Sequence, residues 1–205
     1  MLLQRIQQQF IDSADLKYQC AQTLAPSVEA AIQAVLASVT GGGKVLACGN
    51  GASAAGAQHF AASFIGRYER ERPELAALSL SADAAVLSGL ANDFDTRAVY
   101  ARQVRALGHA GDVLLALSTS GNSANMLAAV EAAHEREMTV VALTGGRGGR
   151  LAQMLRDTDV HVCVPHELPA RILEVHHLVL HAVCDGVDAQ LLGLPDNPLP
   201  EQENP

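Results

Sequence analysis

The stretch KVLACGNGASAAGAQHF, residues 44–60, decides the fold of this chain. It starts as a short apolar strand pattern, passes through a tight polar turn around Asn50, and continues as an Ala-rich helical pattern. A helix N-terminus presents unpaired backbone N–H groups and a partial positive charge, so it suits an anion. The stretch therefore predicts a strand-turn-helix unit with a ligand site at the turn. Its glycines match neither the G-x-G-x-x-G nor the Walker A spacing.

A second stretch repeats this arrangement, because the apolar residues 113–117 are followed by the turn STSGNS, residues 118–123, and then by a helical pattern. Four hydroxyls surround Gly121 in this turn: those of Ser118, Thr119, Ser120 and Ser123. Hydroxyl and backbone N–H groups can surround a phosphate without a lysine. N-capping alone, which is the alternative role, requires only one Ser or Thr. We therefore predict a site for a phosphorylated small molecule.

Strand and helix patterns alternate along the rest of the chain. The strand-like runs are 44–48, 75–80, 113–117, 139–143 and 159–164. Short, continuously apolar strands separated by helices indicate a parallel sheet that is covered on both faces. We therefore predict an α/β three-layer sandwich with a five-stranded parallel sheet. In such sheets ligands bind beyond the carboxyl ends of the strands, where both polar turns fall.

Helical segments flank this core at both ends. Two helical patterns, 2–23 and 28–39, precede the first strand and form a predicted arm, residues 1–40, that packs on another subunit or caps the core. A last helix runs from Pro169 to Leu192. We predict one domain over residues 1–192, followed by an acidic, Pro-rich and disordered tail over residues 193–205.

The composition narrows the range of functions. The formal net charge of −8 argues against direct contact with nucleic acid, which needs a basic face. The sequence shows neither a signal-peptide pattern nor an apolar run long enough for a membrane span. Its four cysteines form no C-x-x-C pair. These features favour a reduced, cytoplasmic protein that does not bind a membrane.

Two further groups of residues could contribute to a site. Asn92 and Asp93 could bond sugar hydroxyls, or they could simply form a turn at the end of a helix. His177 and His181 share a helix face at i and i+4 spacing, but two histidines without a nearby carboxylate make a poor metal site. His181 could act as a general acid or base, because imidazole titrates near neutrality.

Several of these motifs together resemble the sugar isomerase (SIS) domain family. They are Cys48-Gly49-Asn50-Gly51-x-Ser53, Gln58-His59-Phe60-Ala61, Asn92-Asp93, Gly111-Asp112-Val113-Leu114-Leu115, STSGNS at 118–123 and Ala142-Leu143-Thr144-Gly145. Within the family the chain is similar to phosphoheptose isomerases and to the related DnaA initiator-associating proteins. The resemblance implies a homotetramer joined by helical arms. It also implies a sugar-phosphate site lined by Asn50, Gly51, Ala52, Ser53, Asn92, Asp93, Ser118, Thr119, Ser120 and Ser123.

The same resemblance places the catalytic carboxylate of the isomerases four residues after His59, where this chain has Ser63. The zinc ligands of the family would be His59, that carboxylate, a Gln at the position of Leu173, and His181. Two of the four ligand positions have therefore changed, so we expect no resident metal. Serine cannot replace the base, whose loss costs a factor of about 10²–10⁴. Another carboxylate, such as Asp93, could restore the activity.

The helix segment Gln58–Ser63 resembles that of the DnaA initiator-associating proteins, in which a C-terminal apolar pair contacts the initiator. Leu191 and Leu192 match that pair in part. The sequence therefore favours a non-catalytic protein that binds a sugar phosphate and the replication initiator DnaA, and so promotes initiation of chromosome replication. The alternative is an active phosphoheptose isomerase, which converts sedoheptulose 7-phosphate to D-glycero-D-manno-heptose 7-phosphate for lipopolysaccharide core synthesis. A sugar-phosphate sensor is a third reading.

Overall fold

The computed structural model describes residues 1–193, so nearly all of the predicted tail lies outside the described residues. Five parallel strands form one sheet in the order β2-β1-β3-β4-β5, which confirms the predicted α/β architecture. The strands are β1 (Val45–Gly49), β2 (Ala77–Ser79), β3 (Val113–Ser118), β4 (Thr139–Gly145) and β5 (Val160–Val164).

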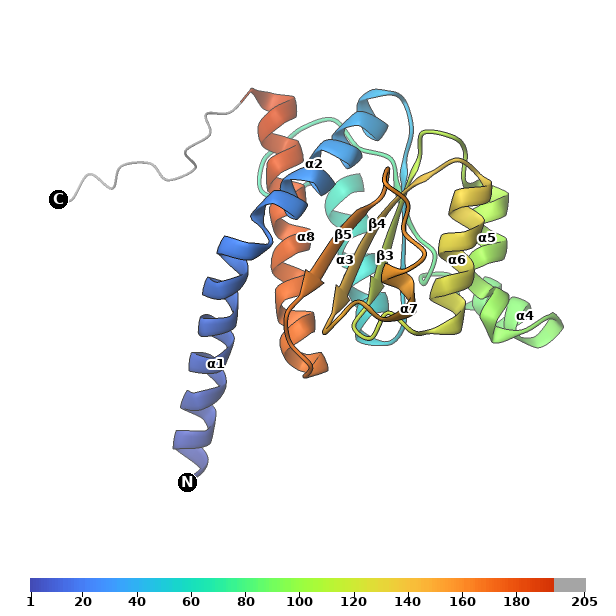
Figure 1. Ribbon diagram of the computed structural model, residues 1–205. Coiled ribbons are helices and arrows are strands. Elements are labelled where there is room, and N and C mark those ends of the chain that lie inside the picture. Colours follow the sequence, from blue (N-terminus) through green and yellow to red (C-terminus); the bar gives the residue numbers. More distant parts are fainter. Residues whose placement is uncertain (194–205) are drawn as a thin grey trace.

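Helices cover both faces of the sheet, so the domain has three layers (Figure 1). One face packs against α2 (Ala25–Thr40), α3 (Ala52–Ile65) and α8 (Pro169–Leu192). The other face packs against α5 (Val99–Leu107), α6 (Ala124–Glu135) and α7 (Gly149–Ala152). The remaining elements are α1 (Leu2–Thr23), α4 (Ala84–Asp93) and the 3₁₀ turn η1 (Thr96–Ala98).

Strand side chains alternate between the two cores, as the pleat requires. In β1, Val45 and Ala47 enter the core beneath α2, α3 and α8, whereas Leu46 and Cys48 enter the core beneath α5 and α6. Every residue of β1 and β3 is buried. Burial on both faces explains why these strands read as continuous apolar runs in the sequence.

The N-terminal helix α1 projects away from this body (Figure 1). Only Leu16 and Cys20 of α1 are buried. Its outer part exposes several large apolar side chains, among them Leu3 (68%), Ile6 (46%), Phe10 (75%) and Tyr18 (74%). An apolar surface of this kind is typical of an interface with another protein chain.

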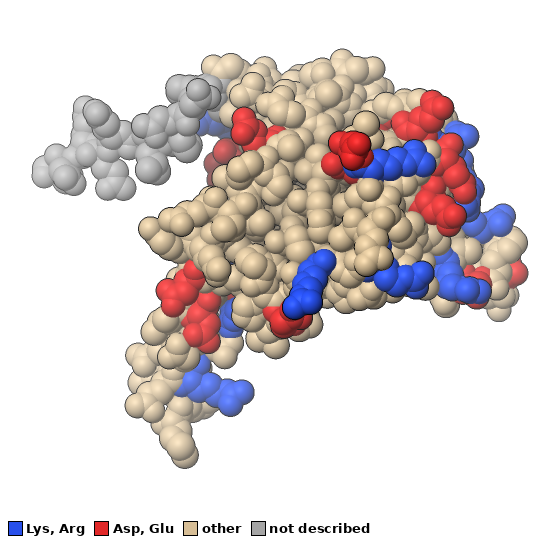
Figure 2. All heavy atoms as spheres, in the orientation of Figure 1, with Lys and Arg blue, Asp and Glu red and all other residues tan. Residues whose placement is uncertain are grey.

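No single helix within residues 1–193 is long and apolar enough to cross a membrane. The consecutive helices α1 and α2 pass that test of length and composition only when they are taken together, and the pair is bent by 69°. On the face shown in Figure 2, Lys and Arg side chains are interspersed with Asp and Glu side chains over α5 and α6 and along α1. This face therefore has no continuous basic stripe.

A buried arginine fastens α3 to α8. The Arg72 guanidinium donates to the backbone carbonyl groups of Ser63 (2.9 Å) and Phe64 (2.8 Å), and these two carbonyls belong to the last turn of α3. Its Nε donates to the Asp188 carboxylate on α8 at 2.5 Å, and both side chains are nearly inaccessible to solvent. Arg72 thus satisfies helix-end carbonyls and a buried charge at the same time.

We expect Asp188→Asn to lower the free energy of unfolding by about 3 kcal/mol, because it leaves the buried Arg72 charge without its partner. Urea denaturation followed by circular dichroism measures this loss. Asp185→Asn is a matched control, because Asp185 is an exposed carboxylate on the same helix. Equal stability of the two variants would contradict the role given to Arg72.

Candidate functional site

The two polar turns of the sequence meet where the strand order changes direction. Strands β1 and β3 are neighbours, and the chain leaves their carboxyl ends toward opposite faces of the sheet. Ligands of α/β sheets bind at such a point between two strands. Asn50 follows β1, and Asn125 lies in the first turn of α6. Their side-chain amides donate to each other at 2.9 and 2.8 Å. This reciprocal pair joins the first turn to the start of α6, directly after the second turn.

The first turn is held by hydrogen bonds that reach the carbonyl oxygen of Gly49. The Tyr100 hydroxyl donates to the Gly49 carbonyl oxygen at 2.5 Å, and the Ser81 hydroxyl lies 3.2 Å from the same oxygen. A Cβ on Gly49 would come within 2.7 Å of the Ser53 Cβ. Glycine is therefore required here, because α3 begins in direct contact with the end of β1.

The second turn is held against the loop that follows β4. Gly121 has a φ of 63°, and an added Cβ would lie 1.9 Å from the Gly148 carbonyl oxygen. The Leu151 N–H donates to the Gly121 carbonyl at 2.9 Å, and the Arg150 N–H donates to Asn122 Oδ1 at 3.0 Å. The hydroxyl-rich turn and the loop of residues 145–150 therefore form one packed unit.

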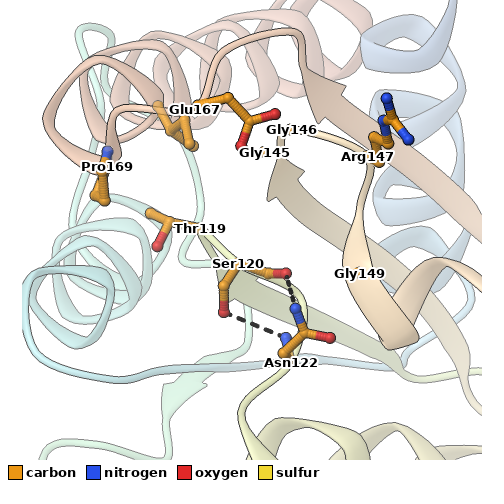
Figure 3. A pocket seen from close by; sticks show the side chains of 10 residues that line it. Thr119, Ser120, Asn122, Gly145, Gly146, Arg147, Gly149, Glu167 and Pro169 are labelled. Carbon is orange, nitrogen blue, oxygen red and sulfur yellow. Dashed lines mark hydrogen bonds between the residues drawn. The ribbon is translucent and has the colours of Figure 1, made fainter.

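A cavity of about 320 Å³ lies between these two loops and the start of α8. Thr119 and Ser120 from the second turn line it, together with Glu167 from the segment before α8 (Figure 3). The Ser120 carbonyl accepts from Asn122 Nδ2 at 2.9 Å, which fixes the floor of the cavity. The complete lining is Thr119, Ser120, Asn122, Gly145, Gly146, Arg147, Gly149, Glu167, Pro169 and Ile172.

Two histidines meet farther along the helices that start at this edge. His59 of α3 and His181 of α8 place their Nε2 atoms 2.9 Å apart, and their rings meet edge to face. His177 and Tyr68 are close neighbours of the pair, with ring centroids 6.1 Å from His59 and 5.5 Å from His181 respectively. Burial lowers the pKa of His181, and the neighbouring His59 and His177 lower it further.

The third histidine of α8, His176, is structural. It is completely buried, and its Nε2 lies 3.0 Å from the Thr144 carbonyl oxygen at the end of β4. Burial lowers its pKa to about 4, so the ring stays neutral at pH 7 and can donate to that carbonyl. This contact fixes α8 against the sheet.

These residues do not form a complete zinc site. The Ser63 hydroxyl donates to the backbone carbonyl of His59 at 3.0 Å, so it is used within its own helix. Leu173 precedes His181 by eight residues, which is about 12 Å along α8. Residues 1–193 contain no group of three or more His, Cys, Asp and Glu side chains that could hold a metal ion. Two imidazoles alone fall short of the three or four protein ligands that zinc takes.

The structure brings together most of the predicted sugar-phosphate residues. Asn50, Gly51, Ala52 and Ser53 form the first turn and the start of α3, and the four hydroxyl residues form the second. Asn92 and Asp93 lie at the end of α4, where the Asn92 amide donates to Asp93 Oδ1 at 2.8 Å. No hydrogen bond within residues 1–193 joins this pair to the two turns, so its assignment stays a prediction.

Sequence reasoning missed several residues that build this site. Asn125 follows a recognised turn, but its partner, Asn50, is 75 positions away. Tyr100 and Ser81 reach Gly49 from distant segments in the same way. Glu167 lies between a strand and a helix, with no motif around it. Only the tertiary structure shows that these side chains converge.

The fold and the paired turns define a sugar isomerase domain, and the family comparison agrees: a family model described as the SIS domain matches residues 9–145. The chain belongs to the SIS domain family, within the phosphoheptose isomerase group. A phosphoheptose isomerase of Methylibium petroleiphilum is 62% identical over 196 residues, covering 96% of this chain and 98% of that protein.

Two solved structures are similar over most of the chain. Phosphoheptose isomerase GmhA from Neisseria gonorrhoeae has a TM-score of 0.88 and 48% identity, covering 92% of this chain and 100% of that one. A phosphoheptose isomerase from Francisella tularensis has a TM-score of 0.86 and 39% identity, covering 92% and 98%. The predicted five-stranded fold with N-terminal helices is therefore confirmed.

The prediction of a non-catalytic protein that binds DnaA is wrong. A relative 62% identical over nearly the full length is a phosphoheptose isomerase, and the similar structures above carry the same name. That prediction gave too much weight to Ser63 and Leu173, whereas the likeness extends over the whole domain. Leu191 and Leu192 lie at the end of α8 with 38% and 39% of their surfaces exposed, and this exposure does not identify a partner.

We expect Asn125→Ala to weaken sugar-phosphate binding several-fold with little loss of stability, because it removes two exposed hydrogen bonds that position Asn50. Isothermal titration calorimetry measures the affinity, and a thermal unfolding curve measures the stability. Gln33→Ala removes an exposed amide from α2 and serves as the control. Unchanged affinity in Asn125→Ala would show that the amide pair does not position the site.

Proposed function

We propose that this chain is a phosphoheptose isomerase, which interconverts the ketose and aldose forms of a seven-carbon sugar phosphate. The observation that carries the proposal is the His59–His181 pair, whose Nε2 atoms are 2.9 Å apart on helices that start at the phosphate-binding edge. The 62% identity to a phosphoheptose isomerase supports the choice of substrate class. The reaction moves a proton between neighbouring carbons, so it needs groups that exchange protons near neutral pH.

The phosphate group binds at the two turns in this proposal. The backbone N–H groups at the start of α6 and the hydroxyls around Gly121 would surround it. The proposed contacts are Asn50, Gly51, Ala52, Ser53, Ser118, Thr119, Ser120 and Ser123, with Asn92 and Asp93 as further candidates. His59 lies seven residues after the start of α3, or about 10 Å along the helix axis. A sugar phosphate with its phosphate and carbonyl groups at opposite ends can bridge this separation.

The histidine pair supplies the proton transfer. Because burial and the neighbouring histidines lower the pKa of His181, its imidazole is neutral at pH 7 and can accept a proton. His59 is the second proton-transfer group of this proposal, because its Nε2 lies 2.9 Å from that of His181. Ser63 takes no part, because its hydroxyl is bonded to its own helix and serine is a weak base.

We further infer that residues 1–192 act as a single domain within a homotetramer. The exposed apolar side chains of α1, which include Phe10 and Ile11, support an assembly through this arm (residues 1–40). The four cysteines are free thiols, which suits the reducing cytoplasm.

An isomerase assay tests the proposal. Purified protein should convert sedoheptulose 7-phosphate, and His181→Gln should lower kcat by about 10²–10⁴-fold because the proton-transfer group is lost. Ser63→Ala is the matched control, and it should change kcat by less than about threefold. If the wild-type protein showed no conversion above the uncatalysed rate, the proposed activity would be refuted.

The pH dependence of kcat/KM gives a second test. The base form of His181 is lost as the pH falls through its pKa, and that pKa lies below the ordinary value of 6.5. We therefore expect the acid limb of the profile to fall below pH 6.5, with a plateau toward pH 7. An acid limb above pH 7 would show that a different group accepts the proton.

A further inference from the structure

Glu167 is a carboxylate in the cavity that the proposed reaction leaves without a role. It lines the cavity beside Thr119 and Ser120, which belong to the hydroxyl-rich turn. It forms no salt bridge with any residue in the described part of the chain, Arg147 included. Its charge is therefore available to a ligand.

Hydrogen bonds hold the backbone segment that carries Glu167, which is an exposed residue. The Gly146 N–H donates to the carbonyl groups of Val164 (3.0 Å) and His166 (2.9 Å), and the Leu168 N–H donates to His166 Nδ1 (3.0 Å). Both ends of the short segment around Glu167 are thus tied down. An added Cβ on Gly146 would lie 3.2 Å from each carboxylate oxygen, so the carboxylate stands directly over Gly146.

The carboxylate faces the two hydroxyl residues across the cavity. Figure 3 shows Glu167 on one side, beside Gly145 and Gly146, with Thr119 and Ser120 on the other. Carboxylate oxygens accept hydrogen bonds and cannot donate them at neutral pH, whereas hydroxyl groups can do both. This set of groups is complementary to the hydroxyls of a sugar.

The Glu167 side of the cavity is a poor partner for a phosphate group. A phosphate beside Glu167 would meet a like charge, and like charges placed together are unfavourable. Arg147 also lines the cavity, so its wall carries one charge of each sign. The phosphate is better placed at the N-terminus of α6, beside Thr119 and Ser120, which leaves the Glu167 side of the cavity to the uncharged part of the ligand.

We propose that Glu167 accepts hydrogen bonds from hydroxyl groups of the bound sugar and so makes the site select a polyhydroxylated sugar phosphate over free phosphate. The proposal rests on the proposed function, because the ligand is the sugar phosphate of that same site. Glu167 is here a binding and selectivity residue, and the proton transfer stays with His59 and His181.

Calorimetric titration of two ligands tests the proposal. Sedoheptulose 7-phosphate and inorganic phosphate are titrated separately into the wild-type protein, Glu167→Ala and Glu167→Gln. We expect Glu167→Ala to raise the Kd for the sugar phosphate about tenfold or more, because it removes hydrogen bonds to a charged acceptor. The Kd for inorganic phosphate should stay the same or fall. Glu167→Gln, which keeps one acceptor oxygen, should lie between.

The control is Asp157→Asn, which removes an exposed carboxylate just before the amino end of β5, at the opposite edge of the sheet. It should bind both ligands as the wild type does, and thermal unfolding should show that all variants are folded. In the isomerase assay Glu167→Ala should raise KM with little change in kcat, because binding and not chemistry is affected.

The proposal is overturned by an equal effect of Glu167→Ala on both ligands, by no effect on either, or by a wild-type protein that binds no sugar phosphate. Failure of the proposed function looks different. If sugar phosphate binds and its affinity depends on Glu167 but no turnover occurs, Glu167 keeps its role and the isomerase activity is refuted.

Discussion

The site depends on the clamp that Arg72 makes between α3 and α8. Removing a charged pair from water is costly, and hydrogen bonds of good geometry offset that cost. Arg72 donates to Asp188 Oδ1 and to two carbonyl groups at the end of α3, whereas Asp188 Oδ2 has no hydrogen-bond partner within the described residues. Since α3 carries His59 and α8 carries His181, the clamp ties together the two helices that bring the imidazoles into contact.

The two ends of the proposed ligand site are positioned by different physical means. At the proposed phosphate end, backbone N–H groups and short hydroxyl side chains are held by contacts between loops, chiefly Gly121 against Gly148. At the imidazole end, long helices are held by side-chain burial and by Arg72. The sheet connects the two ends, because β1 leads into α3 and β3 leads into the hydroxyl-rich turn.

Much of this architecture follows from the sequence, and the rest depends on contacts that no local pattern contains. Periodicity predicted every strand, and it placed the last helix from Pro169 to Leu192, as observed. The hydroxyl-rich turn was predicted from the sequence because four of its six residues carry a hydroxyl group, and that density indicates a phosphate site. The Asn50–Asn125 pair and the carboxylate of Glu167 could not be found, because tertiary contacts align them. The functional prediction failed because two substituted positions, Ser63 and Leu173, were given more weight than the whole-domain similarity to phosphoheptose isomerases.

The contact between Gly121 and Gly148 constrains how this site can evolve. No side chain fits at position 121, where an added Cβ would lie 1.9 Å from a backbone oxygen, so neither loop can change shape without the other. The shape of the proposed phosphate site therefore resists change through a single substitution of Gly121, because any side chain there would collide with the neighbouring loop. Diversification toward new sugars must instead come through the side chains on the cavity wall, at positions such as 147 and 167, which can vary without moving the backbone.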